Sequence, residues 1–319
     1  MSISPPSLET VHTLAIATLP SCSDAVVERV AQGVSTYVYR LHCGDARYYL
    51  RVLPEAGASF APEVRVLELL HTRGVSAPWV VYFSHHEPAL GASALITTEI
   101  PGRSLAEAGV SEHIAAVLFE AGQMLATINS FPVEGFGWIA RDQPRVLALR
   151  AEHRAFRDFA LEQLDEHLHV LGAVVLSPGE VAQLRGLLRR YDDWLEVDRA
   201  VLAHGDFDVT PIFQHAHRCS GIIDFGEIRG AHQWYDLGHF HFHDGETVPV
   251  PLLPRLLAGY RTVIAFPDDA LQRIAFAALL IGQRSLARLL QKHGAAPRIA
   301  PYVAAGVAAL RRDMTLLDI

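Results

Sequence analysis

A change of pattern at Pro101-Gly102 most constrains how this chain of 319 residues can fold. Before it, short runs rich in Val, Tyr and Leu are separated by Gly and Asp turn signals, and the pair Thr36–Leu41 and Arg47–Leu53 predicts a β-hairpin. After it, apolar residues recur at helical spacing, as in the stripe from Ile114 to Ile128. The pattern predicts an α+β fold with a small antiparallel-sheet lobe, residues 1–101, and a larger, mainly helical lobe, residues 102–319.

Local signals place further elements in each lobe. Pro62 suits the first turn of a helix that ends at Gly74, and two more strands are predicted at Trp79–Phe83 and Ala94–Ile100. Ser177-Pro178-Gly179-Glu180 is a capping box that opens a helix in the second lobe. We therefore expect strands around one helix in the first lobe and mostly helices in the second.

Composition narrows the classes of partner and compartment. A net charge of −8 disfavours a nucleic-acid partner, and no apolar run reaches the length of about 20 residues that spans a bilayer. The first residues lack the basic start and apolar core of a signal peptide. Cys22, Cys43 and Cys219 form no CxxC pair, so we expect no disulfide framework. These features predict a cytoplasmic protein that binds neither nucleic acid nor membrane.

Two acidic residues follow short apolar runs inside the helical part. Asp206 comes after the run Ala200–Ala203, and Asp224 comes directly after Ile222-Ile223. If both runs are strands, both carboxylates can lie at strand ends facing one cleft. Phosphoryl transfer needs that arrangement, because one carboxylate orients the attacking hydroxyl and the other holds Mg²⁺ against nucleotide phosphates. The alternative is a pair of glycine-containing turns that carry solvated aspartates.

The sequence His204-Gly205-Asp206, followed by Ile222-Ile223-Asp224-Phe225-Gly226-Glu227, resembles the catalytic and metal loops of the aminoglycoside phosphotransferase and choline kinase family. The resemblance covers roughly residues 25 to 290. It implies a two-lobed protein-kinase-like fold, ATP or GTP and Mg²⁺ as cofactors, and a small-molecule hydroxyl group as the phosphoryl acceptor. It also implies that Asp206 is the catalytic base, that Asp224 is the principal Mg²⁺ ligand, and that Asp236 steadies the catalytic loop.

The resemblance extends to the nucleotide-binding residues of the first lobe. Arg51 stands where the family has a lysine that bridges the nucleotide's phosphates, and Glu63 is its expected partner on the neighbouring helix. The chain has a single lysine, Lys292, so arginine takes this role here. The remaining residues implied by the resemblance are Ser35 and Thr36 beside the phosphates, and Glu99 and Ile100, whose backbone would read the purine edge.

Pro211 departs from the family's pattern, which usually has asparagine there as a ligand of a second metal ion. Proline has neither a side-chain ligand nor an N–H group. Arg51, in place of the family's lysine, is the second departure. A protein that binds nucleotide without transferring phosphate, a pseudokinase, is therefore the main alternative function.

Alternating histidines at His239, His241 and His243 suggest a further alternative, a His/Asp metallohydrolase. On a strand these three imidazoles would share one face and could bind zinc. The run Leu237–Phe240 resembles the start of a helix, however, and alternating residues do not share a face of a helix.

Overall fold

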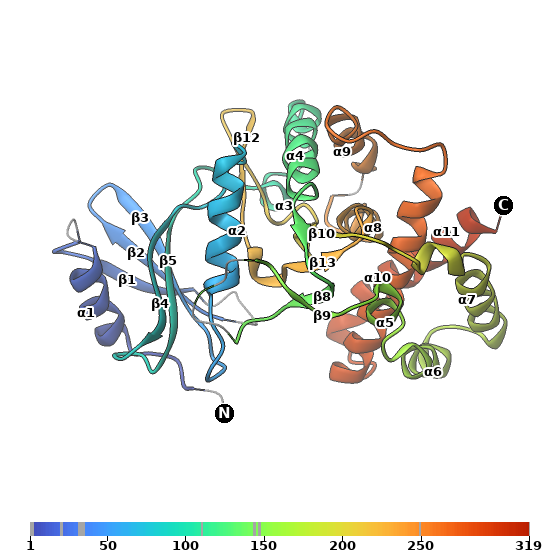
Figure 1. The fold of residues 1–319 in the computed structure, drawn as a ribbon, viewed down its shortest axis with the longest axis horizontal. Helices are drawn as coiled ribbons and strands as arrows, with labels where there is room; N and C mark the ends of the chain where they lie inside the picture. Colours follow the sequence, from blue (N-terminus) through green and yellow to red (C-terminus); the bar gives the residue numbers. More distant parts are fainter. Residues whose placement is uncertain are drawn as a thin grey trace. The chain divides into compact units, whose positions relative to one another are not determined.

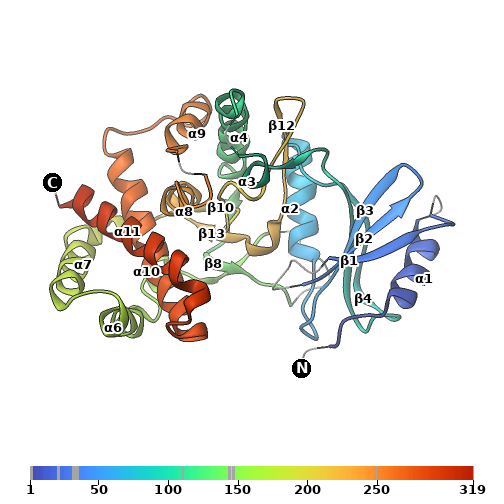
Figure 2. The same cartoon turned by 180° about the vertical axis from the view of Figure 1, so that it is seen from behind.

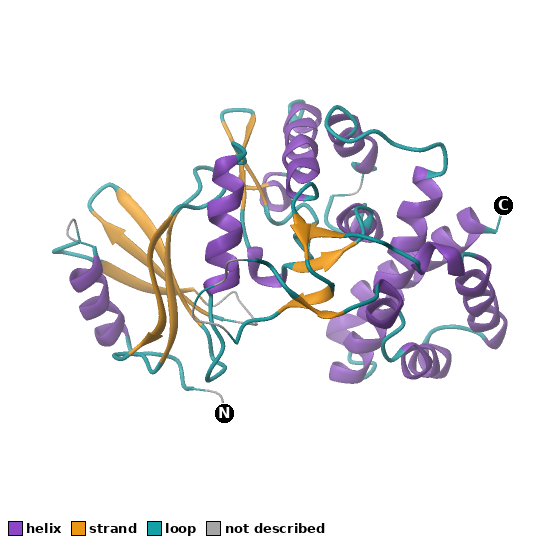
Figure 3. Cartoon of the chain, in the orientation of Figure 1, coloured by secondary structure: helices purple, strands orange, loops and turns teal. Residues whose placement is uncertain are grey.

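The structure is a computed structural model, and it describes residues 3–19, 22–30, 36–109, 111–142, 145, 148–248 and 250–318 (Figure 1). The chain divides into two compact units. The first comprises Met1–Gly102, Ile139–Leu149 and Ser220–Gly226, and the second comprises Arg103–Trp138, Arg150–Cys219 and Glu227–Ile319. An antiparallel sheet dominates the first unit and helices dominate the second (Figure 3), which confirms the predicted α+β class.

The first unit is built on a five-stranded antiparallel sheet in the order β1-β2-β3-β5-β4. β2 and β3 form the predicted hairpin, and its turn is shorter than expected because strand pairing continues to Cys43 and Ala46. The prediction missed the first helix and the first strand. The elements are α1 (Leu8–Thr18), β1 (Val26–Val30), β2 (Tyr37–Cys43), β3 (Ala46–Val52), α2 (Ala61–Thr72), β4 (Val80–Glu87) and β5 (Ala92–Thr98).

Different helices cover the two faces of this sheet, and Figures 1 and 2 both place α1 and α2 on opposite sides of it. Leu50 and Val52 of β3 are buried in a cluster that includes the apolar side of α1. Side chains alternate between the faces of a strand, so Arg51 points to the other face. Its neighbour in register, Leu95, packs there with Phe60, the residue that precedes α2. The pleat of β3 therefore directs Arg51 toward α2.

A disulfide joins Cys22 and Cys43, whose Cα atoms are 4.7 Å apart. The expectation of no disulfide was wrong. Cys22 follows α1 and Cys43 ends β2, and both belong to the buried cluster under α1. Sequence spacing carried no signal of the pairing, because only the packing of α1 on the sheet brings the two residues together.

The second unit contains a small sheet in the order β7-β10-β13-β8-β9. β10 and β12 are the short strands predicted before the two acidic residues, and β12 leads the chain into the first unit. The strands of this sheet are β7 (Pro132–Val133), β8 (Phe136–Ile139), β9 (Ala151–His153), β10 (Ala200–Ala203) and β13 (Arg229–Ala231). The other strands after Gly102 are β6 (Arg103–Ser104), β11 (Ile212–His215) and β12 (Arg218–Ile222), which pair in the order β12-β11-β6.

Helices make up most of the second unit. α10 packs against α6, α8 and α11, and α4 packs against α9. The predicted stripe of α4 is buried, and the capping box of Ser177 and Glu180 begins α7. The helices are α3 (Leu105–Ala108), α4 (Ile114–Ile128), α5 (Phe156–Ala160), α6 (Leu164–Val174), α7 (Pro178–Arg190), α8 (Tyr235–His243), α9 (Leu253–Tyr260), α10 (Ala270–His293) and α11 (Ala300–Leu317), with 3-10 turns at Asp192–Leu195, Phe225–Glu227 and Pro297–Ile299.

A search of the helices for a membrane span gave none: within the described ranges, no helix combines the length and the apolar character that a bilayer crossing requires.

The disulfide predicts a specific thiol count and a stability effect. Titration of unfolded, unreduced protein with a thiol reagent should find one reactive thiol per chain, Cys219, and reductant should raise the count to three. Reduction should lower the free energy of unfolding of the first unit by about 3 kcal/mol, because the closed loop no longer restricts the unfolded chain. Three thiols before reduction, or identical urea midpoints with and without reductant, would contradict the pairing.

Candidate active site

The loop after β10 is held by a buried carboxylate at the start of α8. Asp236 is completely buried, and it accepts hydrogen bonds from the backbone N–H groups of His204 (2.8 Å) and Gly205 (2.9 Å). A carboxylate that bonds to backbone N–H groups of a loop fixes the course of that loop. Asp236 thus has the position expected of the residue that steadies the catalytic loop.

Asn129 and Tyr260 complete this buried network. The amide nitrogen of Asn129 donates to Asp236 (2.8 Å) and to the carbonyl of Leu202 in β10 (3.0 Å), and the hydroxyl of Tyr260 donates to Asn129 Oδ1 (3.1 Å). Burial, with the nearby charge of Asp236, raises the pKa of Tyr260 and keeps its hydroxyl a donor. Three helices, α4, α8 and α9, therefore meet on the loop that carries Asp206.

Gly205 is required because the backbone at Glu227 comes very close to it. Its φ of +92° lies in the left-handed region, and a Cβ there would come within 1.9 Å of the carbonyl oxygen of Glu227. Arg229 supports that segment by donating from Nε to the same carbonyl (3.0 Å) and from Nη1 to the Tyr235 hydroxyl (2.7 Å). Its guanidinium also lies 4.1 Å from the ring centroid of Trp138.

Asp206 presents its carboxylate from this fixed loop, with 59% of the side chain exposed. Nε2 of His239, on α8, lies 3.3 Å from Asp206 Oδ1, and Nδ1 of the same ring lies 3.2 Å from the carbonyl oxygen of Phe207. A carbonyl and a carboxylate both accept, so both ring nitrogens must carry hydrogens for both contacts to be hydrogen bonds. The hydrogen bond from His239, with the nearby charges of His204 and His243, holds the pKa of Asp206 well below its usual range.

The alternating histidines lie on a helix, as the Leu237–Phe240 pattern predicted. Each of them contacts a different carboxylate: His239 contacts Asp206, His241 contacts Asp313 (2.9 Å), and His243 contacts Glu246 (2.6 Å). Across the part of the chain that the structure describes, no group of three or more His, Cys, Asp or Glu side chains is arranged to hold a metal ion. The motif that suggested a zinc site thus forms three separate pairs.

In the first unit, Arg51 forms a buried ion pair with Glu63. Only 14% of the Arg51 side chain and 4% of the Glu63 side chain are exposed, and the guanidinium lies 5.2 Å from the ring centroid of Phe60. Removing a charge from water costs desolvation energy, and an opposite charge close by offsets part of that cost. Glu63 therefore holds the Arg51 guanidinium against this face of the sheet. The structure thus brings together the two residues that the sequence paired across β3 and α2.

Asp224 belongs to the same unit and lies beside this pair. Its Oδ1 is 3.9 Å from Nη2 of Arg51, its side chain is 65% exposed, and its φ is +65°, a left-handed conformation that a non-glycine residue seldom adopts. A Cβ on Gly226 would come within 3.2 Å of Arg51 Nη2 and 3.3 Å of Asp224 Oδ1. Arg141 donates to the carbonyl of Gly226. Arg141 lies outside every sequence motif, so it was not predicted.

The donor set around Asp224 fits one hard cation. Mg²⁺ prefers oxygen ligands such as an exposed carboxylate, and Asp224 supplies one. Pro211 is buried at the end of the loop that carries Asp206, where it offers no side-chain oxygen. Two cationic side chains, Arg51 and Arg141, lie close enough to Asp224 and Gly226 to suit phosphate oxygens.

Of the other residues predicted to contact the nucleotide, the structure describes Thr36, Glu99 and Ile100. Ser35 lies outside the described residues, and Thr36 precedes β2. The carboxylate of Glu99 accepts from the Tyr49 hydroxyl (3.1 Å) and from Arg47 (3.3 Å), and its backbone N–H donates to the Arg47 carbonyl (3.1 Å). Both the side chain and the backbone N–H of Glu99 therefore form hydrogen bonds with residues of β3. Ile100, which follows it, is buried.

The structure thus groups Arg51, Glu63 and Asp224 in the first unit, whereas Asp206 and His239 lie in the second.

Solved structures with similar folds cover almost all of this chain. A thermostable mutant of aminoglycoside phosphotransferase APH(4)-Ia, in ternary complex with ADP and hygromycin B, has a TM-score of 0.70 and 19% identity, over 96% of this chain and 98% of that chain. The GDP complex of aminoglycoside 2'-phosphotransferase-IIIa has a TM-score of 0.65 and 14% identity, over 98% and 99%. A putative fructosamine-3-kinase from Thermobifida fusca has a TM-score of 0.61 and 20% identity, over 94% and 99%. At these identities the likeness shows the fold, which is the predicted protein-kinase-like one.

A search of curated proteins finds no match to this chain. The family model described as "Phosphotransferase enzyme family", APH, matches residues 26–276, most of the chain's length. The chain therefore belongs to the APH phosphotransferase enzyme family.

Proposed function

We propose that this protein transfers the γ-phosphoryl group of ATP or GTP to a hydroxyl group of a small molecule, with Asp206 as the residue that orients that hydroxyl. The proposal rests on the fixed position, the exposure and the charged form of the Asp206 carboxylate. Its loop is fixed by Asp236, its carboxylate is more than half exposed, and His239 keeps it in the charged form. Phosphoryl transfer depends mainly on positioning and on charge stabilisation, with the proton taken late.

Arg51, Glu63 and Asp224 would serve the nucleotide. Glu63 holds the guanidinium of Arg51 in place, and the planar guanidinium can bind two phosphate oxygens at once. Asp224 would hold Mg²⁺, which neutralises charge on the phosphate oxygens when it is bound. The neighbouring Arg141 adds positive charge near the same loop. This proposal assigns the nucleotide to residues 1–101 together with the Asp224 segment, and the acceptor to residues 102–319.

Hydrogen bonding within the sheet limits which backbone groups of Glu99 and Ile100 could contact a purine. The backbone N–H of Glu99 donates to Arg47, so the carbonyl of Glu99 and the backbone of Ile100 would have to read the purine edge. Thr36 and Ser35 stay proposals for the phosphate-covering segment. The APH(4)-Ia structure with ADP and the 2'-phosphotransferase-IIIa structure with GDP support a nucleotide as ligand without choosing between ATP and GTP.

A nucleotide-binding protein without phosphoryl transfer is the second candidate, and Pro211 is the observation that favours it. Proline cannot ligate a second metal ion from this position. A single well-placed carboxylate, Asp224, would then support nucleotide binding but not turnover.

The first test is replacement of the proposed base. With ATP or GTP, Mg²⁺ and a panel of amino-alcohols, aminosugars and sugars, the wild-type protein should release ADP or GDP in an acceptor-dependent way. Asp206→Asn should lower kcat by about 100- to 10,000-fold, the range over which a positioned base contributes, and should leave thermal unfolding of the nucleotide complex nearly unchanged.

Asp158→Asn is the matched control, because Asp158 is an exposed aspartate in the same unit and lies on α5, away from the loop. It should retain wild-type kcat. Nucleotide-dependent thermal stabilisation with no turnover on the whole panel would favour the pseudokinase. Equal activity of Asp206→Asn and wild type would remove Asp206 from the mechanism.

The contact between His239 and Asp206 predicts a pH effect. The hydrogen bond lowers the pKa of Asp206, so the carboxylate stays charged as the pH falls below the ordinary aspartate range. His239→Gln should raise the pKa of Asp206 toward its usual value of about 3.9, and the acid limb of the kcat/KM profile should move to higher pH. His241→Gln is the control, since His241 bonds to Asp313 instead. Superimposable acid limbs for His239→Gln and wild type would contradict the role of His239.

Pro211 predicts a gain of metal binding on substitution. Pro211→Asn supplies an amide oxygen, and it should tighten the binding of a second Mn²⁺ to the protein–nucleotide complex by at least about tenfold, with a rise in kcat. Pro211→Ala removes the ring without adding a ligand, and so separates ligation from loop flexibility. If both variants bind Mn²⁺ alike, as measured by electron paramagnetic resonance, Pro211 does not limit the metal site.

A further inference from the structure

Arg284, on α10 of the second unit, is a buried cation whose charge is not balanced by a carboxylate. Only 8% of the residue is exposed, and across the described residues no acidic side chain forms an ion pair with it. Its Nη2 donates to the backbone carbonyls of Phe159 and Ala160 at the end of α5, and no described acceptor reaches its buried Nε–H group. Charged side chains in native proteins are almost never buried without a partner. Arg284 therefore calls for both a counter-charge and an acceptor at Nε.

The charges that surround Arg284 are positive in sum. Burial lowers the pKa of Arg284, and the like charges of Arg288 and Arg229 add to the shift. The negative charge of Glu162 opposes it, and Glu227 forms an ion pair of 3.0 Å with Arg229. Arginine remains protonated at pH 7 even so. Three guanidinium groups and two carboxylates leave one net positive charge, which favours an anion.

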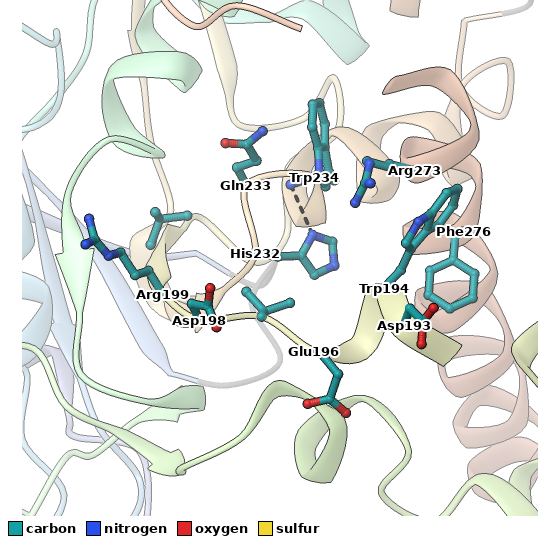
Figure 4. A pocket seen from close by; sticks show the side chains of 12 residues that line it. Asp193, Trp194, Glu196, Asp198, Arg199, His232, Gln233, Trp234, Arg273 and Phe276 are labelled. Atoms are coloured by element: carbon teal, nitrogen blue, oxygen red, sulfur yellow. Dashed lines mark hydrogen bonds between the residues drawn. The ribbon is translucent and has the colours of Figure 1, made fainter. Parts of the chain in front are cut away.

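A cavity of about 10 Å³ adjoins Arg284. Side chains of α5 and α10 form its mainly apolar walls, and its polar lining residues besides Arg284 are Tyr235 and His232. A space of this size holds one water molecule or one small ion and excludes an organic ligand. The much larger cavity of about 730 Å³ in Figure 4 is a separate space, because the described linings of the two cavities have only His232 in common.

His232 adds no charge to the small cavity. Its Nδ1 accepts a hydrogen bond from the backbone N–H of Trp234 (3.1 Å; Figure 4), and burial lowers its pKa to about 3. The ring is therefore neutral near pH 7. Phe156 packs against it edge to face, with ring centroids 4.5 Å apart. Among the described lining residues, Arg284 is thus the one that carries a charge.

Tyr235 provides a second hydrogen-bond donor at this cavity. Its hydroxyl oxygen accepts a hydrogen bond from Nη1 of Arg229 (2.7 Å), which leaves the hydroxyl hydrogen free to donate. Within the described ranges no acceptor takes that hydrogen, and only 6% of the residue is exposed. In a cavity that admits one small ion, a single acceptor can be reached by both Tyr235 and Nε of Arg284.

We propose that this cavity binds one chloride ion, or a monovalent anion of the same size, which accepts hydrogen bonds from Nε of Arg284 and from the hydroxyl of Tyr235. The ion balances the buried guanidinium charge, which a water molecule of similar size cannot do. It joins the middle of α10 to the start of α8, where Tyr235 directly precedes Asp236. The site does not depend on the proposed phosphoryl transfer.

Bromide locates the site in the wild-type protein, because it resembles chloride in charge and size and scatters anomalously. Crystals of the full chain grown with sodium bromide should show an anomalous peak in the cavity beside Arg284 and Tyr235. Crystals grown with sodium chloride should hold a non-anomalous atom at the same point. Absence of the bromide peak from the cavity, or peaks at exposed arginines alone, would overturn the proposal and leave water as the occupant.

Thermal unfolding at constant ionic strength measures the effect of the ion on stability. Sodium chloride at several times its Kd should raise the wild-type Tm by about 2–4 °C relative to sodium gluconate, because gluconate is too large for the cavity and chloride binds only the folded state. Arg284→Met removes the charge and should abolish this chloride-dependent rise. Tyr235→Phe should weaken chloride binding about three- to tenfold through loss of one hydrogen bond.

Arg288→Met is the matched control, because Arg288 is an exposed arginine one turn further along the same helix. It should keep the wild-type response to chloride, so the comparison removes the general effects of the two salts on protein hydration. An equal chloride-dependent rise in Arg284→Met and Arg288→Met would overturn the proposal. The bromide experiment needs no variant, and so it decides the matter even if Arg284→Met does not fold.

Discussion

The buried carboxylate of Asp236 is the constraint on which the candidate active site depends. It takes the backbone N–H groups of His204 and Gly205, and Asn129 ties it to β10 and, through Tyr260, to α9. An unpaired charge at this depth would be strongly destabilising, so the loop and the carboxylate require each other. The exposed carboxylate of Asp206 follows directly from this fixed backbone. A loop near a protein surface usually moves more than the elements that flank it, and here the network removes that freedom.

A second buried charge organises the first unit. Arg51 and Glu63 face each other because the pleat of β3 turns Arg51 away from α1 and toward α2. Asp224 then lies beside the guanidinium with a backbone conformation that costs energy for a non-glycine residue. We propose that Arg51 binds phosphate in this chain with one lysine, where its guanidinium would offer a planar fork in place of a point charge. Each unit therefore holds one of the two proposed site carboxylates beside a nitrogen-bearing side chain, His239 beside Asp206 and Arg51 beside Asp224.

Local patterns predicted much of this fold, because the signals that they carry act over a few residues. The hairpin of β2 and β3, the stripe of α4 and the capping box of α7 all depend on neighbours in sequence. The protein-kinase-like fold was implied by the resemblance of the two aspartate motifs to those of a known family. The pairing of Cys22 with Cys43 was not predictable, because it depends on how α1 packs on the sheet.

The same limit applies to the candidate site. The pairing of Arg51 with Glu63 followed from a known motif, but the contact of His239 with Asp206 did not, because it joins a loop to a helix more than thirty positions further along the chain. His239 attracted attention only as one of several alternating histidines. Arg141 gave no signal either, since its contact with Gly226 comes from packing that no short pattern encodes.

We propose that Asp224 and Arg51 hold a metal–nucleotide complex and that Asp206 orients the acceptor hydroxyl. A crystal structure with a non-hydrolysable nucleotide and Mn²⁺, with the metal located by its anomalous scattering, tests it most directly. We expect Mn²⁺ bound to the carboxylate of Asp224, phosphate oxygens within hydrogen-bond distance of Arg51, and Asp206 free of metal with its carboxylate facing the terminal phosphate. A metal ion held by the histidines of α8, or a nucleotide bound away from Arg51, would contradict the claim.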